Sequence, residues 1–338
     1  MPPLLALQLS DGRPGHLTLS DGILAALRRR RPVEVRRVEL RRPGWLPARA
    51  LSALSNAGLG PERILRHIYG VDPQVLADVG LVVSAGGDTL AANVAARRLA
   101  GVPNVFYGSL RRYPPEDFSL VLTSYARNAS RPRHAMTLKP SRFNADALAL
   151  PPRPAGEPPL AGLLIGGDAG REVHFAAHDW DRLLAFAEAC GRTIGTRWIV
   201  TNSRRTPDAV SDRLASLVGR GAIAELIDVR NTAPGALDSL LRRAELLAVT
   251  ADSSSMVSEG VWVRRRTISL APAHCALTAD ERGYRDWLGA NGWIRALAIA
   301  SVTPERFAAA LAEITPLTEN PLDALAGLLQ QRLPALLP

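Results

Sequence analysis

Short aliphatic runs alternate with amphipathic stretches along most of the chain, which is the pattern of parallel sheets covered by helices. In the first half, the pattern predicts strands at residues 4–9, 33–40, 81–84, 104–107 and 120–123, with helices near 17–30 and 89–100. In the second half, it predicts strands at 160–165, 198–201, 223–229, 246–250 and 267–270, with helices near 179–190, 207–218, 235–244 and 254–262. We therefore predict an α/β protein built from two doubly wound, Rossmann-like units.

A proline-rich segment separates the two halves. The sequence PPRPAGEPP, which begins at Pro151, cannot continue a helix or a central strand and stiffens a linker. A length of 338 residues also fits two domains, given the roughly 100–200 residues of an ordinary domain. We predict domains at residues 1–150 and 151–320, helices near 304–314 and 321–336, and a terminal segment, 321–338, that crosses back to the first domain.

The bulk composition is that of a folded protein. Hydrophobic residues make up 47% and charged residues 22% of the chain, and no apolar run approaches the roughly 20 residues that span a bilayer. The first residues have no basic region before their apolar run, so we interpret that run as a strand. Cys190 and Cys275 are too few for a disulfide framework. We expect a cytoplasmic location, with peripheral association at the inner face of the membrane as an alternative.

The net charge of +9 comes almost entirely from arginine, because Lys139 is the only lysine among 41 basic residues. Part of this excess is expected from a GC-rich coding bias. The remaining signal is clustering, in runs such as 28–31, 36–37, 41–42 and 111–112. Such clusters form an ordinary solvated surface or attract the phosphates of an anionic lipid or ligand. Nucleic acid is not expected, because the clusters are not interleaved with aromatic residues and no nucleic-acid motif is present.

Polar, glycine-rich loops after predicted strands are the first candidates for a site, because ligands of open α/β sheets bind beyond the carboxyl ends of strands. The first such loop, residues 10–16, reads SDGRPGH. Gly12 and Gly15 allow close backbone approach, and His16 has the chemistry of a general base, with Asp11 as the alternative. The other interpretation is a turn whose histidine is merely solvated.

The second loop, residues 84–89, reads SAGGDT. Either Asp88 or Thr89 is in position to cap the following helix, which by itself explains the aspartate. The pair Gly86 and Gly87 is harder to explain by capping. We expect it to keep side chains away from a surface that binds a ligand.

The third loop, residues 165–170, reads IGGDAG and opens the second unit. Its backbone N–H groups could cradle a diphosphate, although it is neither a G-x-G-x-x-G fingerprint nor a Walker A motif. Asp168, like Asp88, places a carboxylate beside a predicted anion site. Such a carboxylate repels an anion unless arginines or a metal offset it, so the alternatives are a helix cap or a contact to sugar hydroxyls.

Two further loops complete the set. Residues 250–259 read TADSSSMVSE, in which Ser253, Ser254 and Ser255 start a helix and suit a phosphate, while Glu259 suits ribose hydroxyls. The alternative is a serine cap followed by an acidic residue that complements the helix dipole. Residues 201–207 read TNSRRTP and add Arg204 and Arg205, whose guanidinium groups match phosphate geometry.

Four of these loops resemble, in order and type, those of the family of the peptidoglycan N-acetylglucosaminyltransferase MurG. The matching stretches are DGRPGH, VVSAGGDTLAANVAARRLAGVPNVF, IGGDAG and ADSSSMVSEGV. The resemblance implies the GT-B glycosyltransferase fold, with two Rossmann-like domains that face a central cleft. It also implies that His16 is the base, that Gly166 and Gly167 contact the donor diphosphate, and that Glu259 contacts the ribose.

A resemblance that covers nearly the whole chain is to the mitochondrial fission Elm family. It is carried by SDGRPGH, SAGGDTLAANVAARRL, NVFYGSLRRY, LLIGGDAG, TNSRRTP and TADSSSMVSE. Plant members of that family are described as recruiting a dynamin-related GTPase to the mitochondrial surface, and bacterial members have no established reaction. The resemblance therefore implies the fold more directly than the function.

These observations favour a transferase that moves a sugar from a nucleotide diphosphate, UDP among the candidates, to an envelope or lipid-linked acceptor, without a metal or another cofactor. The alternatives are a non-catalytic scaffold that binds a membrane surface or a protein partner, and a nucleotide-sugar epimerase. The donor-side candidates are Gly166, Gly167, Asp168, Asn202, Ser203, Arg204, Arg205, Asp252, Ser253, Ser254, Ser255 and Glu259. The acceptor-side candidates are Gly12, Gly15, Gly86, Gly87, Asp88, Arg111 and Arg112, with His16 and Asp11 as catalytic candidates.

Overall fold

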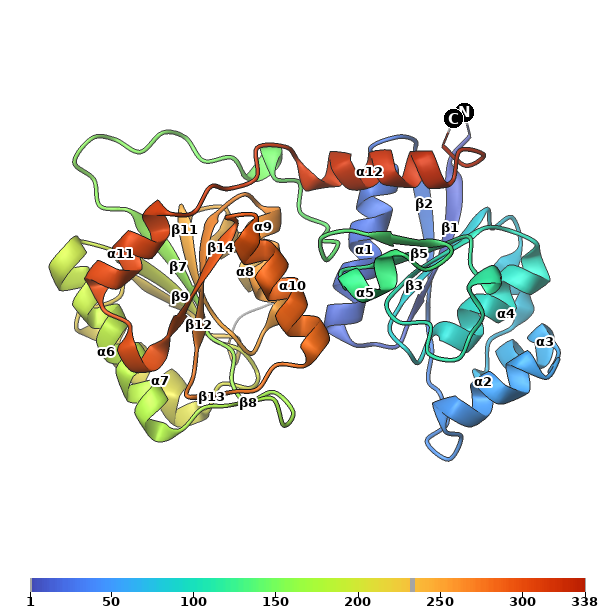
Figure 1. Cartoon of the computed structure of the whole chain (residues 1–338), viewed down its shortest axis with the longest axis horizontal. Coiled ribbons are helices and arrows are strands. Elements are labelled where there is room, and N and C mark those ends of the chain that lie inside the picture. Colours follow the sequence, from blue (N-terminus) through green and yellow to red (C-terminus); the bar gives the residue numbers. More distant parts are fainter. Residues whose placement is uncertain (1, 232–234, 338) are drawn as a thin grey trace. The chain divides into compact units, whose positions relative to one another are not determined.

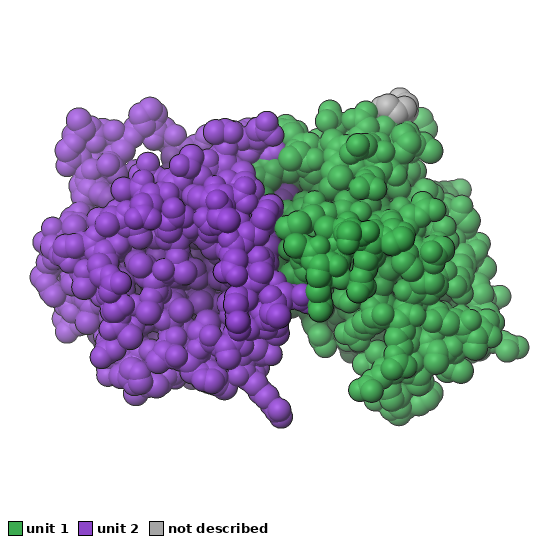
Figure 2. All heavy atoms as spheres, viewed as in Figure 1, with its two compact units in different colours: residues 1–143, 321–338 green, residues 144–320 purple. Residues whose placement is uncertain are grey.

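The computed structural model describes residues 2–231 and 235–337, and the chain divides into two compact units (Figure 2). Unit 1 comprises residues 1–143 and 321–338, and unit 2 comprises residues 144–320. The division falls before the proline-rich segment, whereas the sequence placed it at residue 150. Polar contacts explain the difference, because Asn320 donates to Asn144 and Asp146, and Arg264 pairs with Asp146 at 2.6 Å. The prolines from Pro151 onward thus lie inside unit 2.

Unit 1 is built on a parallel sheet (Figure 1). Its strand order is β2-β1-β3-β4-β5-β6. The strands are β1 (Leu4–Ser10), β2 (Val33–Glu39), β3 (Leu81–Ala85), β4 (Asn104–Tyr107), β5 (Leu120–Thr123) and β6 (His134–Met136). The aliphatic runs predicted all of these strands except β6. That strand begins with His134, so it carries no hydrophobic run that would have marked it.

The helices of unit 1 are α1 (Pro14–Arg28), α2 (Ala48–Asn56), α3 (Pro61–Arg63), α4 (Leu90–Ala100), α5 (Ala126–Ala129) and α12 (Pro321–Arg332). Short helical turns lie at Ile64–Ile68, Pro73–Leu76 and Pro115–Asp117. The closing helix α12 packs on α1, where Arg29 forms an ion pair with Asp323 at 2.7 Å. The end of the chain is therefore part of the first unit, and its helix is anchored there by charge as well as by apolar contact.

Helix α1 starts where the sequence favours a start, because Pro14 has no N–H to lose in the first turn. Its inner face buries Ile23, Leu24 and Leu27. At Gly22 the helix approaches the backbone of Pro140–Ser141 so closely that a Cβ atom would lie 2.5 Å from the Ser141 nitrogen. Gly22 is thus needed for packing and not for a turn.

Unit 2 repeats the architecture with the order β10-β9-β7-β11-β12-β14, all parallel. Its strands are β7 (Leu160–Leu164), β9 (Arg197–Thr201), β10 (Glu225–Ile227), β11 (Leu246–Thr250), β12 (Arg266–Ala271) and β14 (Ile294–Ala298), with β8 (Val173–His174) and β13 (His274–Cys275) in a small antiparallel pair. Its helices are α6 (Ala177–Ile194), α7 (Asp208–Gly219), α8 (Ala236–Leu241), α9 (Ser254–Trp262), α10 (Ala279–Ala290) and α11 (Pro304–Ala312), with short turns at Asp146–Leu148 and Ile299–Ser301.

Both sheets reverse their strand order at one place. In unit 1 the chain adds β2 at one edge of β1, and then adds β3, β4, β5 and β6 in succession beyond the other edge, so the reversal lies between β1 and β3. In unit 2 the reversal lies between β7 and β11. In doubly wound sheets in general, ligands bind beyond the carboxyl ends of the strands at such a reversal. In the part of the chain that the structure describes, no helix is long and apolar enough to cross a membrane.

Candidate functional site

The loops after β1 and β3 meet at the reversal point of unit 1, and they bring two predicted residues together. The Nδ1 atom of His16, in the first turn of α1, lies 2.7 Å from Oδ2 of Asp11. The Asp11 side chain is only 4% exposed, while that of His16 is 30% exposed. The sequence had offered Asp11 as an alternative to His16, and the structure places the two as a pair.

This geometry gives the two residues different roles. A carboxylate only accepts hydrogen bonds, so Nδ1 of His16 carries the proton that it donates to Asp11. The other ring nitrogen, Nε2, keeps its lone pair and can accept a proton from a ligand. Asp11 also holds the ring in place, and it is positioned to stabilise an imidazolium if Nε2 accepts a proton.

The two glycines of the second loop make room for the side chains of His16 and Arg111. Gly86 has φ +88°, and a Cβ there would collide with the imidazole of His16. A Cβ at Gly87 would collide with the guanidinium of Arg111. We predicted that this pair keeps side chains away from a surface. The structure gives a specific reason for two glycines here, because any larger residue would occupy the space of the His16 or Arg111 side chain. Gly12 also needs its positive φ of +74°, whereas Gly15 has open space around it.

Asp88 is neutralised by arginines and does not cap a helix. Its carboxylate lies 3.1 Å from Nε of Arg42 and 3.4 Å from Nη2 of Arg13. Thr89 occupies the cap position of α4, yet its hydroxyl donates to the carbonyls of Ala85 and Gly86 instead of accepting from an N–H group. Capping is therefore the wrong explanation for the Asp88 side chain, and the arginines offset its charge.

Gly87 also lines a cavity of about 360 Å³ in unit 1. Arg111 and Arg112, both predicted acceptor-side residues, line it together with Arg42 and Arg49. Its remaining wall comes mainly from apolar groups of α2 and α4 and from two tyrosines. The sequence singled out Arg42 only as part of the basic run 41–42. Arg49 and the tyrosines were not selected, because they come from segments far from the glycine-rich loops.

In unit 2, the loop Ile165–Gly170 uses backbone N–H groups, which the sequence suggested were free for a ligand, to bond to the end of β11 and the loop after it. The N–H of Gly166 donates to Oγ1 of Thr250 at 2.7 Å, and the N–H of Gly167 donates to Oδ2 of Asp252 at 3.2 Å. Both amides are thus already bonded and do not cradle a diphosphate in this arrangement. That part of the prediction is corrected: the glycines allow the loops to pack, since a Cβ at Gly167 would meet the Arg205 carbonyl oxygen.

Asp252 acts through its neighbours. Its side chain is fully buried, and its Oδ2 lies 2.5 Å from Nη2 of Arg205. Burial raises the pKa of Asp252, against the lowering effects of its hydrogen bond with Thr250 and of the Arg205 charge. Asp252 therefore fixes Arg205 and the glycine loop, and it is not placed to touch a ligand itself.

The serine-rich loop supplies the start of α9. Ser253 is the cap residue, and its Oγ accepts from the N–H of Met256 at 3.3 Å. Ser254 and Ser255 follow in the first turn and are partly exposed. Glu259 is buried, with 8% of its surface exposed, which leaves little of it for a ribose. The capping interpretation is thus correct for Ser253, while the first turn remains accessible to an anion.

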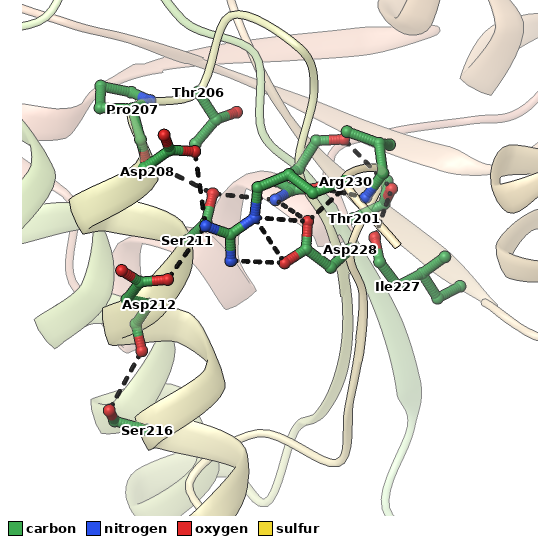
Figure 3. A network of polar contacts seen from close by, with 12 residues as sticks. Thr201, Thr206, Pro207, Asp208, Ser211, Asp212, Ser216, Ile227, Asp228 and Arg230 are labelled. Atoms are coloured by element: carbon green, nitrogen blue, oxygen red, sulfur yellow. Dashed lines mark hydrogen bonds and ion pairs between the residues drawn. The ribbon is translucent and has the colours of Figure 1, made fainter. Parts of the chain in front are cut away.

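A polar network that includes Asp228 and Arg230 holds the loop Thr201–Pro207 in place (Figure 3). Asn202 is buried and donates to Ser211 and Asp228, so it holds the loop instead of presenting itself to a ligand. Ser203 accepts from the N–H of Arg205. Arg204 is exposed and has no side-chain partner among the described residues, so its charge is available.

Arg230 completes this network. It binds Asp228, just after β10, at 2.7 Å and reaches Asp212 at 3.0 Å and Asp208 at 3.4 Å on α7 (Figure 3). Its contacts with Asp228 lower the pKa of that carboxyl from 3.8 to about 2. The network ties β10 to the helix that follows the Arg204–Arg205 loop.

Acid is expected to weaken this network. A carboxyl group whose pKa is lower in the folded than in the unfolded state stabilises the fold at any pH above its unfolded pKa. The contribution of Asp228 is therefore fully present above pH 3.8 and is lost as the pH falls towards about 2. Arg230→Ala should therefore lower the free energy of urea unfolding at neutral pH, and the difference from wild type should vanish near the lower value. Arg220→Ala, an exposed arginine of the same unit, is the control. A constant difference across this pH range would contradict the assignment.

Asp168 lies away from these contacts. It is exposed, accepts from the N–H of Phe175 at 2.9 Å and lies 3.2 Å from Nδ1 of His174. The Phe175 N–H and, second, His174 lower its pKa. No group of three or more histidine, cysteine or acidic side chains in the described ranges could hold a metal ion.

Comparison with known proteins identifies the family. The sequence profile described as mitochondrial fission ELM1 matches residues 14–325. The chain belongs to the mitochondrial fission ELM1 family. This confirms the resemblance inferred from the loop motifs. No curated protein sequence matches this ELM1-family chain.

Solved structures show the fold of this ELM1-family protein. MurG of Acinetobacter baumannii has a TM-score of 0.53 and 14% identity, over 97% of this chain and 100% of that one. S. aureus MnaA has a TM-score of 0.56 and 10% identity, over 99% and 98%. CalG4, the calicheamicin glycosyltransferase, has a TM-score of 0.51 and 13% identity, over 99% and 95%. The chain thus has the GT-B fold of two Rossmann-like units, as the sequence predicted.

Proposed function

We propose that this protein is a glycosyltransferase whose unit 2 binds a nucleotide diphosphate sugar and whose unit 1 binds and deprotonates the acceptor. The observation that carries the proposal is the His16–Asp11 pair at the strand-order reversal of unit 1. A partly exposed imidazole held by a buried carboxylate is the arrangement of a general base.

The donor assignment is supported by cationic groups in the loop after β9 and by N–H groups in the loop after β11. Arg205 is fixed by Asp252, Arg204 is free among the described residues, and the first turn of α9 presents the positive end of a helix dipole. One structure of similar fold supports a nucleoside diphosphate as the ligand class, because MnaA was solved with UDP. The rhamnosyltransferase SpnG, with a TM-score of 0.50 and 16% identity, was solved with its spinosyn aglycone, which is not a nucleotide.

In the proposed reaction, Nε2 of His16 takes the proton of the acceptor hydroxyl. The hydroxyl oxygen forms a bond to the anomeric carbon, and the bond between that carbon and the diphosphate oxygen breaks. The electron pair of the broken bond stays with the leaving nucleoside diphosphate, whose charge Arg204 and Arg205 stabilise. Every step uses groups of the chain itself, so no cofactor is invoked.

Donor binding is tested by thermal unfolding against UDP-, GDP-, ADP- and CMP-sugars. A donor present at about 100 times its dissociation constant should stabilise the native state by about 2.7 kcal/mol. The variant Arg204→Ala should lose most of this shift, because it removes an exposed charge without disturbing Asp252. Arg192→Ala, an exposed arginine on α6, is the control. A panel without any shift at millimolar concentration would overturn the proposal.

A scaffold function is the second candidate, and one surface feature favours it. Trp45 is 80% exposed in a loop that also carries Arg41 and Arg42. An exposed tryptophan beside arginines suits an anionic membrane surface or a protein partner, such as the dynamin-related GTPase of fission. Binding to anionic vesicles that is lost in Trp45→Ala and kept in His16→Ala would support this candidate.

A further inference from the structure

The cavity beside Gly87 combines arginines and apolar side chains in one lining. It has a volume of about 360 Å³, which lies in the lower part of the range of roughly 300–1,000 Å³ for small-molecule sites. It lies wholly within unit 1, between α2, α4 and the segment that follows β4. The cavity is thus defined without reference to unit 2.

The rim of the cavity is cationic. Arg49, Arg111 and Arg112 line it, are exposed, and have no side-chain ion pair among the described residues. Arg42, the fourth arginine, is already paired with Asp88. Three guanidinium groups without a carboxylate around one opening repel each other, so a multiply charged anion would stabilise them.

The backbone of Arg111 supports a role in binding. Its φ is +54°, a left-handed conformation that costs a residue with a Cβ roughly 1 kcal/mol or more. The conformation lays the guanidinium over Gly87, where any side chain would collide with it. The chain thus holds one arginine in a strained position at the rim, against a glycine that leaves it room.

The floor of the cavity is apolar. Leu51 and Leu90 are buried there, and Tyr69 contributes a ring whose hydroxyl is occupied by the carbonyl oxygen of Asp88. Burial raises the pKa of Tyr69, and burial also raises the pKa of Tyr113 to about 12, so both rings stay neutral at physiological pH. An anion alone would leave this floor in contact with water.

We infer that this cavity binds the phosphate ester of an apolar alcohol, with the phosphate at Arg49, Arg111 and Arg112 and the apolar chain on the Leu51–Leu90 floor. The inference rests on the proposed function in one respect, that this phosphate ester is the lipid part of the sugar acceptor, whose reacting hydroxyl lies on another group of the same molecule. Gly86 contacts the base His16 and Gly87 contacts the rim residue Arg111, so adjacent residues link the cavity to the catalytic pair.

The inference is tested by calorimetric titration with octyl phosphate, octyl glucoside and inorganic phosphate. Octyl phosphate should bind at least about tenfold more tightly than either of the others, because only it uses both rim and floor. Arg49→Ala and Arg112→Ala should each weaken octyl phosphate about tenfold, as expected for the loss of a charge-assisted hydrogen bond. Arg97→Ala, on the same unit but outside the cavity, should bind like wild type.

A second variant distinguishes the contribution of the apolar floor from that of the arginine rim. Ala48→Trp should fill it from the partly exposed start of α2 and remove the preference for octyl phosphate over inorganic phosphate, while phosphate binding itself remains. Equal binding of octyl phosphate and octyl glucoside, equal binding of octyl phosphate and inorganic phosphate, or rim variants that match Arg97→Ala would overturn the inference. Donor binding in unit 2 is measured separately, so its loss would overturn the proposed function and leave this site in place.

Discussion

Replacing His16 by alanine is expected to lower the turnover of the donor sugar by about 10²–10⁴-fold, the usual contribution of a general base. The imidazole is the group placed to accept a proton, since its Nδ1 is bonded to the buried Asp11. The KM for the donor should change little, because the donor is assigned to unit 2. The measurement is the steady-state release of nucleoside diphosphate from the donor identified by binding.

The matched control is His67→Ala, which removes an exposed histidine of the same unit. Asp11→Asn should lower turnover by about tenfold or more at an unchanged donor KM, because the amide no longer stabilises the imidazolium or fixes its tautomer. His16→Ala with wild-type turnover, or with the same loss as His67→Ala, would remove His16 from the mechanism.

The substitution Gly22→Ala is expected to destabilise unit 1 by about 1–3 kcal/mol, the usual cost of overpacking. The added methyl would lie 2.5 Å from the nitrogen of Ser141 and 2.6 Å from the carbonyl carbon of Pro140, so backbone must move. This cost exceeds the gain of up to about 1 kcal/mol that alanine brings to a helix interior. The measurement is chemical unfolding followed by a probe in unit 1.

Gly15→Ala is the control for this prediction. It lies in the same helix, and nothing approaches within 4 Å of the position of its Cβ. Its effect on the free energy of unfolding should be neutral or slightly stabilising. Equal stability of the two variants would show that α1 does not approach the Pro140–Ser141 backbone as the structure has it.

Local signals in the sequence were enough to predict most strands and the loops that matter. The runs before Ser10 and Ser84 are aliphatic and end in glycine-rich turns, so strand and loop are both marked within a few residues. The doubly wound topology then places the loops after β1 and β3 together without further information. The sequence could also have predicted the pairing of His16 with Asp11, since both lie in one short loop.

The parts that could not be predicted depend on residues far apart in the chain. The amide of Gly166 looks free in the sequence, and its partner Thr250 comes 84 residues later. Asp88 looks like a helix cap, and Arg42, which binds it, lies 46 residues away. Helix α10 was missed because Gly283 and Gly289 lie within it and its mean hydropathy is low.

The most direct test of the account is to follow the identified donor sugar by NMR in the presence of the protein and a lipid extract as the source of acceptor. For a glycosyltransferase, nucleoside diphosphate is released and the sugar leaves the nucleotide, and both signals are expected to be lost in His16→Ala. Recovery of the nucleotide sugar with one inverted centre and no released diphosphate would instead indicate an epimerase, and a donor that stays unchanged would contradict the transferase assignment.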